Sequence, residues 1–359
     1  MLIQKARIPI KDVILIGMLP NFFKKLVYRL RGYKIGKNVS IGFGSIVNAK
    51  EVEIGDNTSI GFLTIIRGKK ITIGNYVSIG SISFLDTPYI EIGDGTKINE
   101  QVFVGGLQFP DSKFIVGRNC QIMQMTFINP AKSVTIGDDS GIGGHCLIFG
   151  HTSWLSIFEG YPVDFQPIEI GKSVSVAWGA FILPGTKIGD GAVIGAQSVA
   201  SRTIPPRCIA VGFPARVVKK YPDFPTEVTD SQKIDFLKRI VNEMLTSFQN
   251  SGLLCSPNGN VYRVVLVREG WFGEKRKEWT LGVSYGAEEQ LDALPPKMDV
   301  NVFLSLLTIP TSVRKHLDSK SIMWIDIEKK EQSDFTNDLG EEVLLFLRRY
   351  GARFFRVKT

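Results

Sequence analysis

The 359-residue chain has few of the residues on which metal and disulfide sites depend. It contains only three histidines, His145, His151 and His316, and four cysteines. The cysteines show no CxxC pairing and have no histidine partners at zinc spacing. We therefore predict no metal site, and we expect the cysteines to be small reduced core residues of an intracellular protein.

Long apolar runs are also missing. No run approaches the ~20 residues that are needed to cross a bilayer. The run from Val13 to Leu19 is short and is followed by Pro20, so it is a poor secretory signal as well. We expect a cytoplasmic protein, and a position at the inner face of the membrane stays open.

The chain has no general surplus of one charge. Residues 1–34 hold eight Lys or Arg against one acid, residues 35–221 hold sixteen against fourteen, and residues 222–359 hold nineteen against twenty. Nearly all of the net charge of +8 thus lies in the N-terminal tenth. This distribution argues against a nucleic-acid partner.

Residues 1–34 are predicted to form a basic amphipathic segment. With Asn21 as the cap, the sequence NFFKKLVYRL places apolar residues on one helical stripe and basic residues elsewhere. The helix either caps the open end of a scaffold or contacts an anionic membrane surface through residues 21–34. We favour the cap, because repeat folds generally need one. The stripe consists of Phe22, Leu26, Val27 and Leu30.

Glycine is frequent, and it comes at fixed spacing. From Ile35 an aliphatic residue, often followed by Gly, recurs every six residues. Grouped in threes, these residues predict the turns of a three-sided parallel coil, in which each aliphatic side chain points inward and stacks on its counterpart in the next turn. The triplets are Ile35, Ile41, Val47; Ile54, Ile60, Ile66; Ile73, Ile79, Leu85; Ile92, Ile98, Val104; Val116, Ile122, Ile128; Ile136, Ile142, Ile148; Ile170, Val176, Ile182; and Ile188, Ile194, Ala200.

The spacing of the triplets locates insertions in this coil. Their starts are 19 residues apart for the first three steps, then 24, 20, 34 and 18. Three hexads make 18 residues, so small insertions enter near Val104–Asp111 and a long one follows Ile148. Corner insertions leave the core in register, and they usually carry function. The long insertion contains His151.

The pattern changes after the coil, and residues 221–359 are predicted to be a helix followed by a small α+β domain of unknown role. We find no catalytic motif in it. The predicted helices are Thr229–Asn250, one after Pro310, and Asn337–Tyr350; the predicted strands are Val261–Val267, Thr280–Tyr285, Val300–Leu307, Ser321–Ile325 and Phe354–Val357.

Residues 35–220 resemble the left-handed β-helix, hexapeptide-repeat acyltransferases, particularly the maltose and galactoside O-acetyltransferases and their relatives in surface-polysaccharide synthesis. The motifs are the in-phase hexads, a His-bearing loop before PIEIG, then ILPGTKIGDGAVIGAQSVASRTIPP and GFPARVV. The resemblance implies a mainly β fold, a left-handed parallel β-helix with an N-terminal helical cap and a C-terminal α+β domain. The left hand follows from the family alone, because parallel crossovers are generally right-handed.

The resemblance also implies a homotrimer, with acetyl-CoA bound as acyl donor in the groove between neighbouring coils. The family's general base is matched by His151, in the motif FGHTS. A histidine titrates near neutrality and can take a proton from a hydroxyl as it attacks the thioester. His145, one hexad earlier, is a second active-site group, the residue that orients His151, or a polar corner residue.

Further residues are predicted to contact the two substrates. The tail Gly212–Lys220 matches the segment that lines the coenzyme in the family, and the backbone N–H groups of Ala177 and Ala196 are candidates to meet the oxyanion. The family's Trp-Ile-Gly triplet is replaced here by Ser175–Ala177, with Trp178 shifted along. The coenzyme residues predicted are Ala177, Trp178, Ala196, Ser198, Pro214, Arg216, Lys219 and Lys220.

The long insertion supplies the candidates for the acceptor. Trp154, Glu159 and Asp164 are predicted to bind it, and Asp139 or either of these acids could orient the imidazole. Aromatic rings suit sugar faces, but the loop aromatics could instead pin the loop onto the coil or onto a neighbouring subunit.

The sequence favours an acetyl-CoA-dependent O-acetyltransferase that acts on a sugar hydroxyl, free or lipid-linked, in bacterial surface-polysaccharide synthesis. The alternatives are N-acetylation of a nucleotide-linked amino sugar and, less favoured, a non-catalytic assembly scaffold. A zinc carbonic anhydrase on the same coil needs three histidine ligands, and the coil has two.

Overall fold

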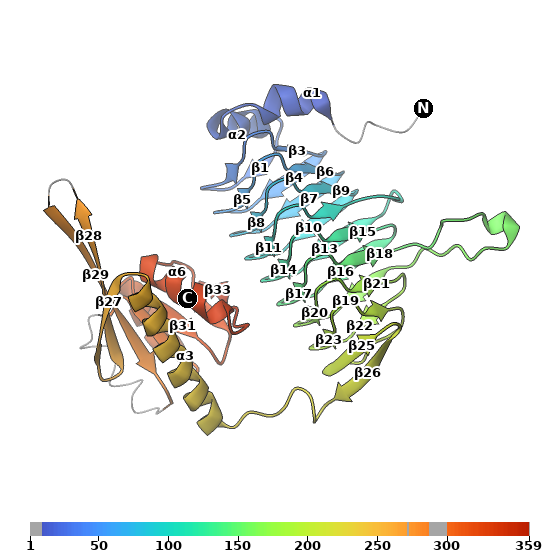
Figure 1. Cartoon of the computed structure of the whole chain (residues 1–359). Coiled ribbons are helices and arrows are strands. Elements are labelled where there is room, and N and C mark those ends of the chain that lie inside the picture. The colour runs from blue at the N-terminus through green and yellow to red at the C-terminus, as the bar shows by residue number, and fades with distance from the viewer. Residues whose placement is uncertain (1–8, 271–272, 287–299, 359) are drawn as a thin grey trace. The chain divides into compact units, whose positions relative to one another are not determined.

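The computed structural model describes residues 9–270, 273–286 and 300–358 (Figure 1). It consists of two compact units, residues 1–226 and residues 227–359. The first unit holds the coil and its N-terminal helices, and the second holds a separate mixed sheet. Each is described by itself.

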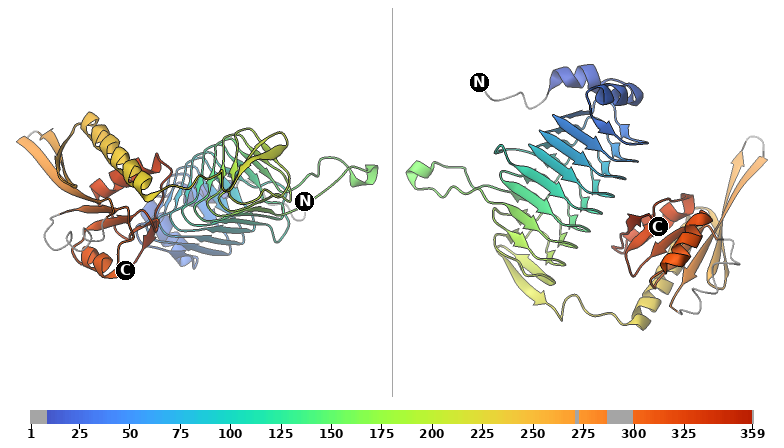
Figure 2. Two further views of the ribbon diagram at one scale, coloured as in Figure 1. Left: turned by 90° about the horizontal axis from the view of Figure 1, so that it is seen from below. Right: turned by 180° about the vertical axis from the view of Figure 1, so that it is seen from behind.

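The coil has three faces, each a parallel sheet in which strands from successive turns lie side by side (Figure 1, Figure 2). Face A consists of β1 (Lys34–Ile35), β4 (Glu51–Ile54), β7 (Lys70–Ile73), β10 (Tyr89–Ile92), β13 (Lys113–Val116), β16 (Ser133–Ile136), β19 (Ile168–Ile170) and β22 (Lys187–Ile188). Face B consists of β2 (Ser40–Ile41), β5 (Ser59–Ile60), β8 (Ser78–Ile79), β11 (Lys97–Ile98), β14 (Gln121–Ile122), β17 (Gly141–Ile142), β20 (Ser175–Val176), β23 (Val193–Ile194), β25 (Cys208–Gly212) and the antiparallel β26 (Ala215–Lys220). Face C consists of β3 (Ile46–Asn48), β6 (Ile65–Arg67), β9 (Phe84–Asp86), β12 (Phe103–Val104), β15 (Phe127–Asn129), β18 (Leu147–Phe149), β21 (Phe181–Ile182) and β24 (Val199–Ala200).

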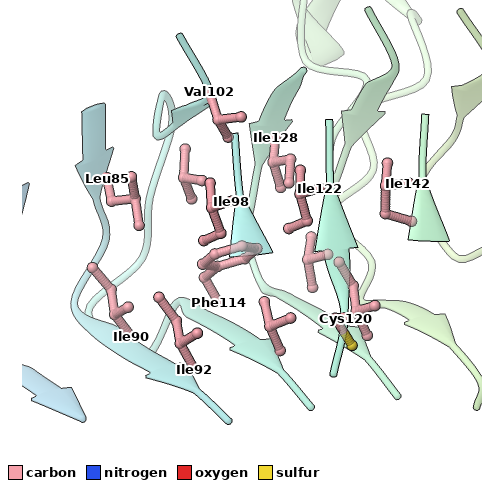
Figure 3. Packing of buried hydrophobic residues seen from close by; sticks show 14 of the residues in the cluster. Leu85, Ile90, Ile92, Ile98, Val102, Phe114, Cys120, Ile122, Ile128 and Ile142 are labelled. Carbon is pink, nitrogen blue, oxygen red and sulfur yellow. The ribbon is translucent and has the colours of Figure 1, made fainter. Parts of the chain in front are cut away.

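The aliphatic triplets form the core of this coil. Corresponding members of successive triplets are direct partners in the sheets, as Ile136 is of Ile170 on face A and Ile148 is of Ile182 on face C. Apart from the partly buried Ile35 at the open end, all of the triplet residues are buried. Figure 3 shows the stacked side chains in the middle of the coil. The predicted fold class, a left-handed parallel β-helix with a helical cap and a C-terminal α+β unit, is confirmed.

The N-terminal cap consists of α1 (Ile10–Asp12), a π-helical turn η1 (Val13–Gly17) and α2 (Asn21–Leu30). It covers the first turn of the coil, but not with its apolar stripe. The first strands present unpaired backbone groups. The Asn21 side chain accepts a hydrogen bond from Ile41 N at 3.0 Å, and the Tyr28 hydroxyl accepts one from Val47 N at 2.8 Å. Phe22, Leu26 and Leu30 of the predicted stripe are exposed, and only Val27 packs partly against the coil.

Both predicted insertions leave the coil at the corner between faces C and A. The shorter one joins β12 to β13, and the longer one joins β18 to β19. The longer insertion projects from the coil as an arm, drawn in green in Figure 1 and Figure 2, with the short helix η2 (Ile157–Glu159) near its tip. The arm therefore interrupts no strand of the coil.

The second unit is a mixed sheet with helices. Residues Thr229 and Gln232 form a capping box at the start of its first helix, in the region where the sequence predicts a helix over Thr229–Asn250. Its strand order is β27-β28-β29-β30-β31-β32-β33. Its elements are α3 (Asp230–Asn250), β27 (Leu253–Asn258), β28 (Val261–Gly270), β29 (Gly273–Ser284), β30 (Val302–Ser305), α5 (Thr311–Ser319), β31 (Met323–Asp326), β32 (Glu331–Ser333), α6 (Asp338–Arg348) and β33 (Phe355–Val357).

Candidate active site

His151 lies at the base of the arm, two residues beyond β18. It forms an isolated antiparallel bridge with Phe165, which lies on the returning side of the arm. The next pair, Thr152 and Asp164, exchanges a backbone hydrogen bond of 3.0 Å and a hydrogen bond of 2.9 Å from Asp164 N to the threonine hydroxyl. The base of the arm is thus ordered like a short hairpin, and it fixes the position of the imidazole.

The imidazole of His151 is surrounded by aromatic rings. The ring centroids of Phe149, Trp154 and Phe165 lie 6.0, 5.5 and 6.2 Å from its own. The residue is only 7% exposed, and this burial lowers the pKa of His151 below its ordinary value. The ring is therefore neutral at physiological pH, which is the form that can accept a proton.

The polar partner of this ring is Ser153. Nδ1 of His151 lies 3.3 Å from the Ser153 backbone N–H, which donates to it, and 3.3 Å from the Ser153 hydroxyl oxygen. While Nδ1 accepts from the Ser153 N–H, the ring proton lies on Nε2. Nε2 can take a substrate proton only in the other tautomer, in which Nδ1–H donates to the Ser153 hydroxyl oxygen.

Sequence reasoning missed a contact that supports the arm. Phe109, from the shorter insertion, packs edge-on against Phe165 with a centroid distance of 5.0 Å, and Lys132 Nζ lies 4.0 Å from the centre of the Phe109 ring. Because both insertions leave at the same corner, the first holds the second at the point where His151 sits. The spacing of the triplets gives this corner, but it does not give the ring pairing.

The predicted acceptor residues lie along the arm. Trp154 is 73% exposed beside His151, and Glu159 is exposed in η2. The Asp164 carboxylate accepts from Phe165 N at 2.8 Å and from the Gln166 side chain. It is therefore engaged within the arm and does not orient the imidazole. Asp139 lies at the corner between faces A and B, away from the arm.

The outer aromatics of the arm do not pin it to the coil. Phe158 is 98% exposed, and Leu155, Ile157 and Tyr161 are exposed as well. An apolar tip of this kind, unburied within a single chain, is typical of a segment that packs on another molecule. Phe158 and Tyr161 therefore do not pin the arm, whereas Trp154 lies against Phe149 of the coil and Phe165 packs on Phe109.

A second cluster forms at the corner between faces B and C, where His145 and Trp178 pack together with a ring centroid distance of 5.4 Å. The indole lies across the backbone of Gly144, where a Cβ would come within 2.5 Å of the ring. His145 itself has a φ of 55°, and its N–H donates to Gln124 O at 3.1 Å. Glycine at position 144 is therefore what lets the indole lie flat on the corner.

The backbone donors at this corner differ from those predicted. The N–H of Ala177 donates to Ile194 O at 2.9 Å, so it does not serve an oxyanion. Within the described chain, the N–H groups of Trp178 and Ala196 have no hydrogen-bond partner. Ser198 is buried, and its hydroxyl accepts from Gly212 N at 2.9 Å, so it holds the tail instead of facing a ligand.

The tail of the coil lies next to the corner between faces B and C. Strands β25 and β26 form a hairpin whose turn contains Phe213 and Pro214, joined by a cis peptide bond. Arg216 pairs with Val211 near this turn, whereas Lys219 and Lys220 lie at the opposite end of the hairpin. All three cations are exposed. The ring of Phe213, which the sequence analysis did not single out, is exposed at this turn.

The two clusters are separate in one chain. His145 precedes β18 at the corner between faces B and C, and His151 follows it at the corner between faces C and A, six positions on and at most roughly 20 Å away at 3.3 Å per residue. His145 therefore does not orient His151 within the same chain.

The fold and the register of its turns define a hexapeptide-repeat β-helix protein, and comparisons of the sequence agree with this class. The chain is 35% identical over 115 residues to the putative lipopolysaccharide biosynthesis O-acetyl transferase WbbJ of Escherichia coli, covering 29% of this chain and 58% of that one. It is 33% identical over 114 residues to galactoside O-acetyltransferase of Escherichia coli, covering 31% of this chain and 56% of that one. The resemblance to these acetyltransferases is confirmed, over about half of their length.

No family model matches the sequence. Among solved structures, the chain is similar to AntD, an N-acyltransferase from Bacillus cereus in complex with dTDP and coenzyme A, with 17% identity, coverage of 62% of this chain and 96% of that one, and a TM-score of 0.33. Among the described residues, no helix is long and apolar enough to cross a membrane. No cluster of three or more His, Cys, Asp or Glu in that part of the chain could hold a metal ion.

Proposed function

We propose that the protein is an O-acetyltransferase that uses acetyl-CoA and acts on a sugar hydroxyl. The observation that carries the proposal is the imidazole of His151, enclosed by aromatic rings at the base of the arm. The names of the two relatives from Escherichia coli support the same reaction. The lipopolysaccharide relative supports an acceptor that belongs to a surface polysaccharide.

The corner between faces B and C has the chemistry that coenzyme A requires. The indole of Trp178 offers an apolar wall, and Arg216 near the hairpin turn offers an exposed cation for its phosphates. Lys219 and Lys220 offer further exposed cations at the other end of the hairpin. The unpartnered N–H groups of Trp178 and Ala196 suit the carbonyl oxygen of the thioester. When bound, acetyl-CoA supplies an acetyl group activated as a thioester.

His151 is assigned the role of general base. Its neutral imidazole takes the proton of the acceptor hydroxyl as that oxygen forms its bond to the acetyl carbon. The same imidazolium then returns the proton to the departing sulfur, so no proton is left over. Ser153 stabilises the cation through its hydroxyl oxygen. Trp154, exposed beside the ring, is suited to stack on the acceptor sugar.

We further propose a homotrimer in which His151 of one chain faces the Trp178 corner of the next. The separation of the two clusters within a chain supports this arrangement, and so does the exposed apolar tip of the arm. The edge between faces B and C adds exposed Phe43 and Phe62, which one chain leaves uncovered. The free, buried thiols of Cys120 and Cys146 are consistent with a reducing compartment, the cytoplasm.

The test is complementation between two impaired variants. Light scattering first gives the oligomeric state, and acetyl transfer from acetyl-CoA to a panel of sugars is then followed by mass spectrometry. His151→Gln and Trp178→Glu should each be nearly inactive alone. In randomly mixed trimers with heterologous interfaces, about a quarter of the sites combine an intact His151 with an intact Trp178. Recovery near that fraction of wild-type activity supports the shared site, and no recovery in proven mixed trimers refutes it.

A further inference from the structure

The outer face of α2 carries the most exposed apolar side chains of the cap. Phe22 is 71% exposed and Leu30 is 80% exposed, and Phe23 and Leu26 are exposed beside them. Phe22 and Phe23 pack edge-on with each other, with ring centroids 5.5 Å apart. These side chains lie at the end of the coil and not at the arm or the substrate corners. We call this surface the cap face; it consists of Phe22, Phe23, Leu26 and Leu30.

The opposite side of α2 explains why the cap face points outward. Asn21 and Tyr28 bind backbone groups of the first coil turn, and the fully buried Lys24 donates its ammonium hydrogen bond to Gly42 O. These polar side chains pair with backbone N–H and C=O groups at the open edge of the coil. An apolar stripe would leave those groups without hydrogen bonds. The polar side of α2 therefore binds the coil, and its apolar side faces outward.

Positive charge lies on the same outer side. At about 100° per residue, Lys25 and Arg29 fall within about one-fifth of a turn of Phe22. Lys25 is half-buried, and Arg29 is exposed while its Nη2 donates to Ile35 O at 3.2 Å. The sequence has one acid before Lys34, Asp12, and its carboxylate accepts from the Asn48 side chain at 2.6 Å. An apolar strip flanked by cations, with little negative charge, complements the surface of an anionic lipid bilayer. Such a surface has charged head groups outside and apolar acyl chains within.

We propose that the cap face docks onto the surface of an anionic lipid bilayer. The apolar side chains would enter the boundary between head groups and acyl chains, and Lys25 and Arg29 would contact the lipid phosphates. The contact is peripheral, because no helix in the described ranges is fit to span a bilayer. This inference goes beyond the acetyl transfer proposed above and does not depend on it.

The probe is a set of vesicles of phosphatidylcholine, with and without phosphatidylglycerol, in a sedimentation assay with the full chain. We expect binding only when phosphatidylglycerol is present, and weaker binding as salt rises. Lys25→Gln with Arg29→Gln should weaken binding about 25-fold, since each cation near an anionic surface is worth about 1 kcal/mol. Phe22→Ser with Leu30→Ser should weaken binding to the same vesicles as well.

Leu254→Ser is the matched control, because Leu254 is 61% exposed on β27 in the other unit. It should leave vesicle binding unchanged, and thermal unfolding of all variants should match the wild type. Two outcomes overturn the proposal. One is equal sedimentation with both kinds of vesicle. The other is a Phe22/Leu30 variant that still binds vesicles but changes the oligomeric state, which would assign the cap face to a second copy of the chain.

Discussion

Replacing His151 with Gln removes the proposed base and keeps a polar side chain of similar size. A positioned general base typically contributes about 10²- to 10⁴-fold. Because burial lowers the pKa of His151, the imidazole is a weaker base than a free histidine, and we expect a loss in the lower half of that range. A decrease of about 10²- to 10³-fold in kcat corresponds to about 2.7 to 4 kcal/mol in the activation free energy.

The pH dependence gives the same substitution a second readout. Wild-type kcat should rise with pH through the folded-state pKa of His151, which lies below 6.5, and then stay level. Between this pKa and the unfolded-state value, the unfolded chain binds more protons than the folded chain. His151 should therefore lower the free energy of unfolding as the pH falls below about 6.5. His151→Gln should remove both dependences.

The assay is steady-state transfer from acetyl-CoA to a hydroxyl acceptor, with the matching amino sugar as an internal comparison. An uncharged amine is already nucleophilic, so His151→Gln should lose far less activity with it. Calorimetry should show unchanged binding of acetyl-CoA to the variant. Full activity on the hydroxyl acceptor, with an unchanged pH profile, would refute the assignment of His151 as base.

Other substitutions test the coenzyme corner and the core. Gly144→Ala should raise the KM for acetyl-CoA with little change in Tm, because the new Cβ would meet the Trp178 ring at 2.5 Å and displace it into solvent; an unchanged KM would contradict the proposed wall. Changing Lys219 and Lys220 to Ala should raise the KM for acetyl-CoA but not for acetyl-pantetheine, which lacks the nucleotide phosphates; equal effects on both donors would exclude the phosphate role. Ile148→Ala should lower the free energy of unfolding in denaturant by about 2–5 kcal/mol, because Ile148 is fully buried; a loss well under 1 kcal/mol would contradict the core assignment.

The coil could be predicted from the sequence because one physical rule governs each of its turns. The residue at each inward-pointing position must be aliphatic. Parallel strand pairing stacks its side chain on the equivalent residue of the next turn. The partnership of Ile136 with Ile170 across the long insertion shows that the rule holds even where the spacing breaks. Deviations from the 18-residue turn therefore located the arm and, with it, His151.

The orientation of α2 could not be predicted in the same way. An amphipathic stripe normally indicates the buried face of a helix, because apolar burial usually dominates. Here the coil presents backbone donors and acceptors at its open end, and Asn21, Lys24 and Tyr28 are used to pair them. The pairing of Phe109 with Phe165 was missed for a related reason, since it joins two loops without periodicity.

The architecture of the coil accounts for the division of the candidate site between two corners. Stacked aliphatic side chains fill the interior of the coil, so substrates must bind on its faces and edges. A site that excludes water from a thioester and a hydroxyl must therefore be closed by a second surface. The arm can provide that surface without disturbing the repeat, because it leaves at a corner and carries its apolar residues at its tip, where Phe158 is 98% exposed. In the proposed trimer, each chain then supplies His151 to one site and the Trp178 corner to another, so assembly of the trimer is itself the step that completes the catalytic group.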